Sequence, residues 1–129
     1  MNWVITLFFF NPTNFIKTTD NSCINTHDLT IWNTTGEKNF RDYMNTCGSQ
    51  CIGNYDCTVS CVQKIENYTT TCCDCFGNLG ECTVKNCFID CIGGDTPPCE
   101  TCISSYCDDS FNKCSGLQVP NPKYISYVN

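Results

Sequence analysis

The chain has 129 residues, a formal net charge of −6 and a sequence pI of about 4.4. This length suits one domain or two very small ones, and the acidic balance excludes nucleic-acid binding through a basic surface. Fifteen residues are cysteine, a share above the roughly 8–10 % that marks a disulfide scaffold. Disulfides at this density persist in an oxidising compartment, so the composition predicts a secreted, extracellular protein.

Metal binding by thiolates is the competing explanation for the cysteines. Zinc sites of the usual kind combine cysteine pairs with each other or with histidines, and the chain has one histidine, His27. Two tryptophans, six tyrosines and eight phenylalanines favour a packed core instead. We therefore expect disulfides, no metal and no cofactor. Because fifteen is odd, at least one cysteine is free, modified or bonded to another chain.

Residues 1–33 are expected to form an N-terminal extended segment. The opening run MNWVITLFFF lacks the basic region and cleavage site of a secretory signal and is too short to span a membrane. Its β-branched and aromatic residues predict a strand over residues 2–10, which needs a sheet in its own chain or in a neighbouring subunit. In the second case the expected subunit contacts are Trp3, Ile5, Leu7, Phe8, Phe9 and Phe10.

Further along this segment, the alternating residues 28–32 predict a second short strand. Two N-glycosylation sequons follow, Asn33-Thr34-Thr35 and Asn67-Tyr68-Thr69. In a secreted eukaryotic protein, Asn33 and Asn67 are the expected sites of N-linked glycans.

A cysteine-stapled helical hairpin is expected over residues 34–76. Its first helix is predicted to start at Thr34, which can form a capping box with Glu37, and to end at Gly53. The second helix is predicted to start near Asp56. Three cysteines and two glycines within residues 72–80 then predict a tight turn.

A second hairpin is expected over residues 77–117, because the cysteine spacing of the first recurs forty residues later. Its first helix is predicted to end at Gly93, and Pro97 is expected to open a continuous helix that stops at Gly116. The tail, residues 118–129, is predicted to be extended with a strand over 124–128. The predicted fold class is therefore small, disulfide-rich and mainly α, with two stapled helical hairpins and short β-strands from both terminal segments.

Nested disulfides follow from this geometry, since the cysteines nearest the turn of an antiparallel hairpin face each other. The expected pairs are Cys51–Cys57, Cys47–Cys61, Cys91–Cys99 and Cys87–Cys102. The remaining seven have no predicted partner: Cys23, Cys72, Cys73, Cys75, Cys82, Cys107 and Cys114. The apolar residues expected inside, beside the cystines, are Phe40, Met44, Ile65, Val84, Phe88, Ile103, Tyr106 and Phe111.

No catalytic constellation is evident, because a single histidine gives no triad from sequence, and we do not expect an enzyme. Four carboxylates near the second hairpin offer oxygen ligands for calcium, although their spacing fits no EF-hand loop. They are Asp95, Glu100, Asp108 and Asp109.

The motif Asn86-Cys87-x3-Cys91, followed by Cys99-x2-Cys102-x4-Cys107-x3-Phe111-x2-Cys114-Ser115-Gly116-Leu117, carries a resemblance. Over roughly residues 47–117 the chain resembles the cysteine-rich helical repeat of secreted protist proteins. The resemblance implies a secreted scaffold, and it extends to glycosylated extracellular filament subunits joined by donated strands. On this reading the partner is the protein itself, in a head-to-tail homopolymer. The alternative is a diffusible pheromone-like ligand or another secreted binding module.

Overall fold

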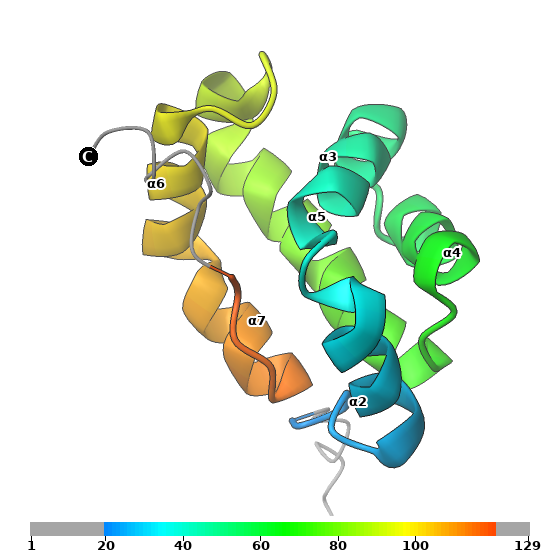
Figure 1. Ribbon diagram of the computed structural model, residues 1–129. Helices are drawn as coiled ribbons and strands as arrows, with labels where there is room; N and C mark the ends of the chain where they lie inside the picture. The colour runs from blue at the N-terminus through cyan, green and yellow to red at the C-terminus, as the bar shows by residue number, and fades with distance from the viewer. Residues whose placement is uncertain (1–19, 121–129) are drawn as a thin grey trace, which may run out of the picture.

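The computed structural model of the protein describes residues 20–120 (Figure 1), and every regular element in that range is helical. In chain order the elements are α2 (Thr26–Ile31), the π-helical turn η2 (Trp32–Gly36), α3 (Phe40–Cys51), α4 (Tyr55–Glu66), α5 (Thr70–Cys91), α6 (Pro97–Tyr106) and α7 (Asp108–Ser115). The strands predicted over residues 2–10 and 124–128 lie outside the described residues, and so do the expected subunit contacts from Trp3 to Phe10.

The β-strands of the predicted fold class are wrong for residues 20–120, which contain none. Residues 28–32 are helical instead, in α2 and the start of η2. Asn25 decides this, because its side-chain Oδ1 accepts a hydrogen bond from the backbone N–H of Asp28 at 2.9 Å and caps α2. Alternation over only five residues is too short a pattern to outweigh such a cap.

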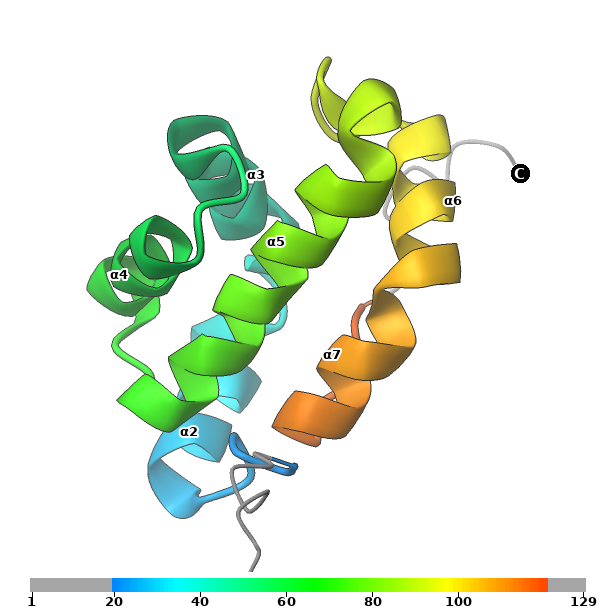
Figure 2. The same ribbon diagram turned by 180° about the vertical axis from the view of Figure 1, so that it is seen from behind.

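The long helix α5 is the central element. Figures 1 and 2 show it running through the molecule, with α3 and α4 on one side and α6 and α7 on the other. Residues 72–80, predicted as a turn, lie inside α5. Their glycines serve close packing against α4, since a Cβ on Gly77 would lie 2.7 Å from Val59 Cγ2, and one on Gly80 would lie 3.0 Å from Thr58 Oγ1.

The predicted boundary between the two hairpins, at residues 76 and 77, therefore lies inside α5. The first stapled pair is α3 and α4, and the first arm of the second is the C-terminal part of α5, which is kinked at Cys87. Pro97 opens α6, as predicted, and the Thr96 side chain caps it. The expected continuous helix up to Gly116 is divided, because Cys107 leaves helical geometry at φ −125° between α6 and α7.

Aromatic side chains from four helices and the turn before α5 fill the core. Phe76 of α5 is fully buried, with ring centroids of Tyr68 and Phe111 each 5.0 Å away. Of the eight residues expected inside, Phe40 and Phe111 are buried, and Met44, Val84 and Ile103 are half-buried. The prediction is wrong for Ile65, Phe88 and Tyr106, which are exposed.

All fifteen cysteines lie in the described range, and fourteen of them form seven disulfides. Four bridges join the residues expected to pair within the hairpins: Cys47–Cys61, Cys51–Cys57, Cys87–Cys102 and Cys91–Cys99. The other three are Cys23–Cys72, Cys75–Cys114 and Cys82–Cys107. Cys73 is free and buried. Five bridges end on α5, whereas α3 and α4 are bridged only to each other.

Candidate functional site: a pocket between α3, α5 and α6

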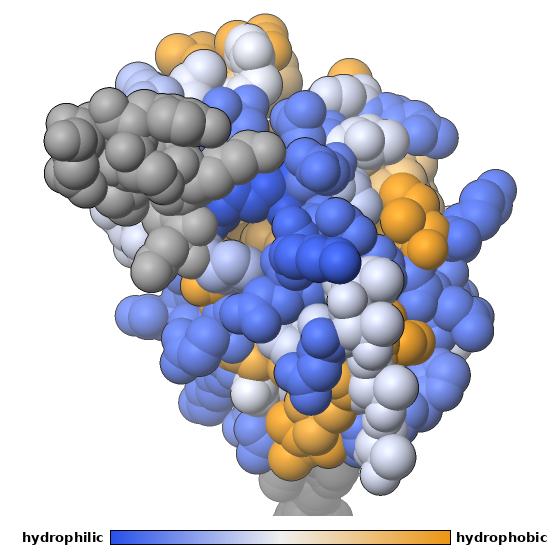
Figure 3. Space-filling view, viewed as in Figure 1, coloured by the Kyte–Doolittle hydropathy of each residue, from blue (hydrophilic) through white to orange (hydrophobic). Residues whose placement is uncertain are grey.

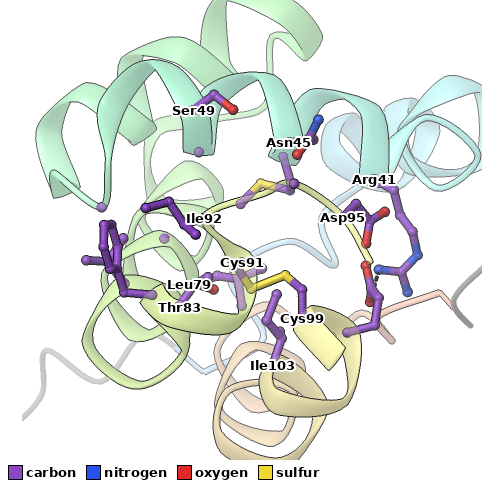
Figure 4. Close-up of a pocket in the computed structure, with 18 of the residues that line it drawn as sticks. Arg41, Asn45, Ser49, Leu79, Thr83, Cys91, Ile92, Asp95, Cys99 and Ile103 are labelled. Atoms are coloured by element: carbon purple, nitrogen blue, oxygen red, sulfur yellow. Dashed lines mark hydrogen bonds and ion pairs between the residues drawn. A yellow bond between two sulfur atoms is a disulfide. The ribbon is translucent and has the colours of Figure 1, made fainter. Parts of the chain in front are cut away.

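A pocket of about 290 Å³ lies where α3, α5 and α6 meet (Figure 4). Its walls are mainly apolar, formed by Phe40, Met44, Ile52, Leu79, Val84, Phe88, Ile92, Ile103 and Val119. A largely apolar concavity with a few polar groups is the usual form of a small-molecule site, and this one is at the lower end of the usual size range.

One face of α3 supplies the first wall. Arg41, Met44, Gly48 and Ile52 follow each other at steps of three and four residues, so they share a face. Gly48 leaves the middle of this wall open, because a Cβ placed there would meet no atom within 4 Å.

The opposite wall is fixed covalently. Cys91 at the end of α5 and Cys99 in α6 form a disulfide, and both line the pocket. Leu79 and Thr83 of α5 and Ile103 of α6 complete this wall (Figure 4). The α5–α6 side is thus stapled, whereas α3 meets it without a bridge.

Charged side chains gather at one end of the pocket. Arg41 donates from Nη1 to Glu100 Oε1 at 2.5 Å and from Nη2 to the carbonyl of Pro120. The Arg41 and Glu100 side chains are only 11 % and 7 % exposed. Asp95 lies beside Arg41, across the pocket from Ile92 (Figure 4), and Asp108 also lines the pocket.

Three buried atoms of this charged end have no hydrogen-bond partner: Arg41 Nε, Asp95 Oδ1 and Asp108 Oδ1. Leaving a buried polar atom unpaired costs roughly 1–3 kcal/mol, and more for a charged group. Such atoms are few in native proteins, and a bound water or ion commonly pairs them. Here all three belong to side chains that line one pocket, although the atoms themselves are fully buried and do not face its interior.

The pKa of Glu100 is raised to about 8, chiefly because burial disfavours the charged form and also because the neighbouring Asp95 carboxyl favours the protonated form. Arg41 acts in the opposite direction. Burial likewise raises the pKa of Asp108, against the lowering effect of Arg41.

The structure brings together three of the four carboxylates considered for calcium, namely Asp95, Glu100 and Asp108, while Asp109 is exposed. Within residues 20–120, no group of three or more His, Cys, Asp or Glu side chains is arranged to hold a metal ion. The guanidinium of Arg41 already supplies a cation here. Sequence reasoning missed Arg41, because nothing in its neighbourhood along the chain points to residues 95–108.

Other predicted site residues lie away from the pocket. Asn33 and Asn67 are both exposed, and Asn67 ends α4 in the left-handed conformation, at φ 60°. His27 is also exposed, with Nε2 2.9 Å from the backbone oxygen of Asn67. Neither sequon therefore contributes to the pocket.

The mouth of the pocket is apolar and open to solvent. Ile52 is 62 % exposed, Phe88 40 % and Ile92 69 %, and all three line the pocket. Ile89, beside them on α5, is also exposed. Figure 3 shows hydrophobic residues at the surface at the top of the view, where α5 ends in Figure 1.

Comparison of the chain with protein-family models, with curated proteins and with solved structures found no match. Of the helices in the part of the chain that the structure describes, none has the length and apolar character needed to cross a membrane.

Proposed function

We propose that the protein is a secreted binding module whose stapled frame holds a small, mainly apolar ligand with a polar head. The observation that carries this proposal is the pocket itself, which combines mainly apolar walls with the charged side chains of Arg41, Asp95 and Asp108 at one end. An apolar body would fit the walls, and a polar head would lie at the charged end. The proposal assigns the protein binding and no catalysis.

The disulfide frame supports an extracellular setting. Seven bridges in one small chain are typical of proteins from an oxidising compartment. Bridges on the α5–α6 wall also reduce the ordering that a ligand would otherwise have to impose, which favours binding by a preformed site.

The test uses the neutral fluorescent dye N-phenyl-1-naphthylamine and the variant Gly48→Leu. A leucine at residue 48 would project from the pocket-lining face of α3 into open space and fill the pocket. Gly93→Leu is the matched control, because Gly93 also has open space around its Cβ but does not line the pocket. We expect saturable dye binding by the native protein and the control, and at least tenfold weaker binding by Gly48→Leu. Equal binding by all three would refute the proposal.

N-linked glycans at Asn33 and Asn67 belong to the same proposal. Both side chains are exposed, although the Thr69 hydroxyl of the second sequon is engaged with Asp28 at 2.6 Å. Intact-mass measurement of protein secreted from eukaryotic cells, before and after enzymatic deglycosylation, tests both sites. Asn33→Gln and Asn67→Gln, each measured alone, would show which sequon is used.

A filament subunit is the second candidate, favoured by the exposed apolar mouth formed by Ile52, Phe88 and Ile92. In this version residues 2–10 of one copy, which are almost wholly apolar, bind that surface of the next copy, and head-to-tail repetition builds a fibre. Residues 28–32, which were expected to provide an acceptor strand in a small sheet, are helical. This version therefore does not use strand donation to that segment. Sedimentation and negative-stain imaging of the full chain and of a chain lacking residues 2–10 test it: fibres should form only from the first.

A further inference from the structure

The C-terminal tail of the chain, residues 121–129, begins beside the pocket. Val119 lines the pocket, and the carbonyl of Pro120, the last residue that the structure describes, accepts a hydrogen bond from Arg41 Nη2 at the charged end. We propose that residues 121–129 fold back into this pocket and over its mouth, so that a ligand must displace them in order to bind. This inference rests on the proposed binding function and adds a means of regulating it.

The segment before the tail has a fixed course. Gly116 ends α7 at φ 81°, and the chain then turns back along α7 toward α6 (Figure 1). The backbone N–H of Val119 donates to Asn112 Oδ1 at 2.9 Å. Arg41, whose side chain is only 11 % exposed, then holds the carbonyl of Pro120. The tail therefore starts at the charged end of the pocket.

The tail is long enough to follow the pocket to its mouth. Arg41 and Ile52 stand at the two ends of the α3 wall, and their positions along the helix put them about 16 Å apart at 1.5 Å per residue. An extended chain covers about 3.3 Å per residue. Residues 121–125 would therefore span this wall, and residues 126–129 would reach the mouth.

The tail is apolar where it would meet the mouth. Most of its last residues are aromatic or aliphatic, namely Tyr124, Ile125, Tyr127 and Val128. The side chains that they would cover, Ile52, Phe88 and Ile92, are exposed. Contact between the two removes apolar surface of both from water, which favours docking. A tyrosine can bury its ring in such a contact and keep its hydroxyl at the solvent.

The charge of the tail also fits. Lys123 is its one charged side chain, whereas three carboxyl groups and one guanidinium line the pocket. The carboxylates outnumber the guanidinium whether or not Glu100 holds a proton. A lysine is therefore attracted to this pocket in either case.

The same chain is the favoured occupant because the tail is tethered at the edge of the site. A tethered segment acts at an effective concentration of the order of millimolar, which a second copy does not reach in dilute solution. The described chain begins at the opposite end of the molecule, beside α2 (Figures 1 and 2). The tail thus starts closer to the pocket than the apolar residues 2–10 do.

Trypsin cleavage after Lys123 tests the docking without altering the tail. Gly48→Leu fills the pocket from α3, and Gly93→Leu is the control outside it. Release of residues 124–129, followed by mass spectrometry, should be at least tenfold faster from Gly48→Leu than from the native chain or the control. Saturating N-phenyl-1-naphthylamine should accelerate release from the native chain to the same extent. Protection that disappears on dilution would place the tail on a second copy and overturn the inference.

A serine variant of the tail tests the competition with a ligand. It combines Tyr124→Ser, Ile125→Ser, Tyr127→Ser and Val128→Ser and changes none of the described residues. It should bind the dye about tenfold more tightly than the native chain, because the apparent affinity falls with the fraction of chains whose pocket is open. The matched control, Asn121→Ser with Asn129→Ser, should bind as the native chain does.

The results separate the inference from the function beneath it. If Gly48→Leu loses the dye while the serine variant binds it no more tightly than the native chain, the binding function stands and the tail inference is wrong. Equal release from Gly48→Leu and Gly93→Leu also overturns the inference. If neither the native chain nor the serine variant binds the dye, the proposed function is wrong, and so is the inference that rests on it.

Discussion

Asp28 and the pocket carboxylates show two outcomes of burying an acidic side chain. Asp28 is fully buried but accepts hydrogen bonds from Asn25 Nδ2 at 2.6 Å, from the Thr69 hydroxyl at 2.6 Å and from the Thr69 backbone N–H at 2.8 Å. Its charge also lies at the N-terminus of α5, where the helix dipole favours an anion. Asp95 and Asp108 each keep a buried oxygen without a partner. The fold thus satisfies its structural carboxylate and leaves those of the pocket incomplete.

Glu100→Gln should remove a pH dependence of stability. The pKa of Glu100 is about 8 in the folded chain, against an ordinary value of 4.5. Between these values unfolding releases a proton, so stability is full below pH 4.5 and falls as pH rises to about 8, by at most about 1.4 kcal/mol per pH unit. The glutamine side chain cannot titrate, so Glu100→Gln should gain stability over the native chain as pH rises.

Urea unfolding at pH 4, 6 and 8 measures this difference in the free energy of unfolding. The control is Glu81→Gln, which alters an exposed carboxylate on α5 and should follow the native curve. A difference between the Glu100→Gln variant and the native chain that stays constant or shrinks as pH rises would contradict the assignment of Glu100.

The Cys73 thiol should be hidden in the native protein. It is fully buried, and burial, with the nearby Asp28 and Asp74 carboxylates, raises its pKa to about 12. Ellman's reagent should detect no thiol in the native chain and one thiol per chain in denaturant. Cys73→Ala should give none under either condition. Rapid reaction of the native chain, or more than one thiol in denaturant, would show that the bridges differ from those described.

At the scale of the helix, close contact between α4 and α5 depends on Gly77. A Cβ there would lie 2.7 Å from Val59 Cγ2 and 2.9 Å from the Tyr55 ring, closer than packed side chains allow. Gly77→Ala should therefore lower the free energy of unfolding by about 1–2 kcal/mol, despite the better helix propensity of alanine.

Gly48→Ala is the comparison, because Gly48 is also helical but has open space around it. It should stabilise the protein by up to about 1 kcal/mol. Chemical unfolding of both variants measures the two effects, and changes of the same sign would contradict this account of α5.

An element can be predicted from the sequence when the interactions that determine it lie close together along the chain. The partners of Cys47 and Cys51 are predictable, since cysteines four residues apart on either side of a short turn must face each other. The course of α5 is not, because Gly77 and Gly80 resemble turn residues until α4 is placed against them. The strand predicted over residues 28–32 is wrong because the cap at Asn25 starts a helix there.

At the scale of the whole molecule, long bridges should stabilise more than short ones. Cys23–Cys72 closes a separation of 49 residues and Cys51–Cys57 one of 6. By loop-closure entropy, replacing both cysteines with alanine should cost about 4 kcal/mol for the first pair and about 2 kcal/mol for the second. Urea unfolding of the two double variants measures these losses, and equal losses would show that entropy of the unfolded chain is not the main cause.

The candidate site also depends on the arrangement of the whole molecule, and for that reason it could not be predicted from the sequence alone. Arg41 comes from α3, Asp95 from the turn before α6 and Asp108 from the start of α7. Their meeting depends on the packing of three helices around α5. The carboxylates lie close together along the chain and can be recognised as a group. Arg41, which lies beside them at the charged end of the pocket, comes more than fifty positions earlier.

The bridges to Cys72 and Cys75 have a mechanical consequence. Cys23 near the start of the described chain is bonded to Cys72, and Cys114 near its end is bonded to Cys75. Tension applied at the two ends therefore crosses from one to the other through residues 72–75, less than one helical turn of α5. The α3–α4 pair and the pocket lie off this load path. Pulled at residues 20 and 120, the described part of the protein should act as a nearly inextensible link that carries force without releasing contour length.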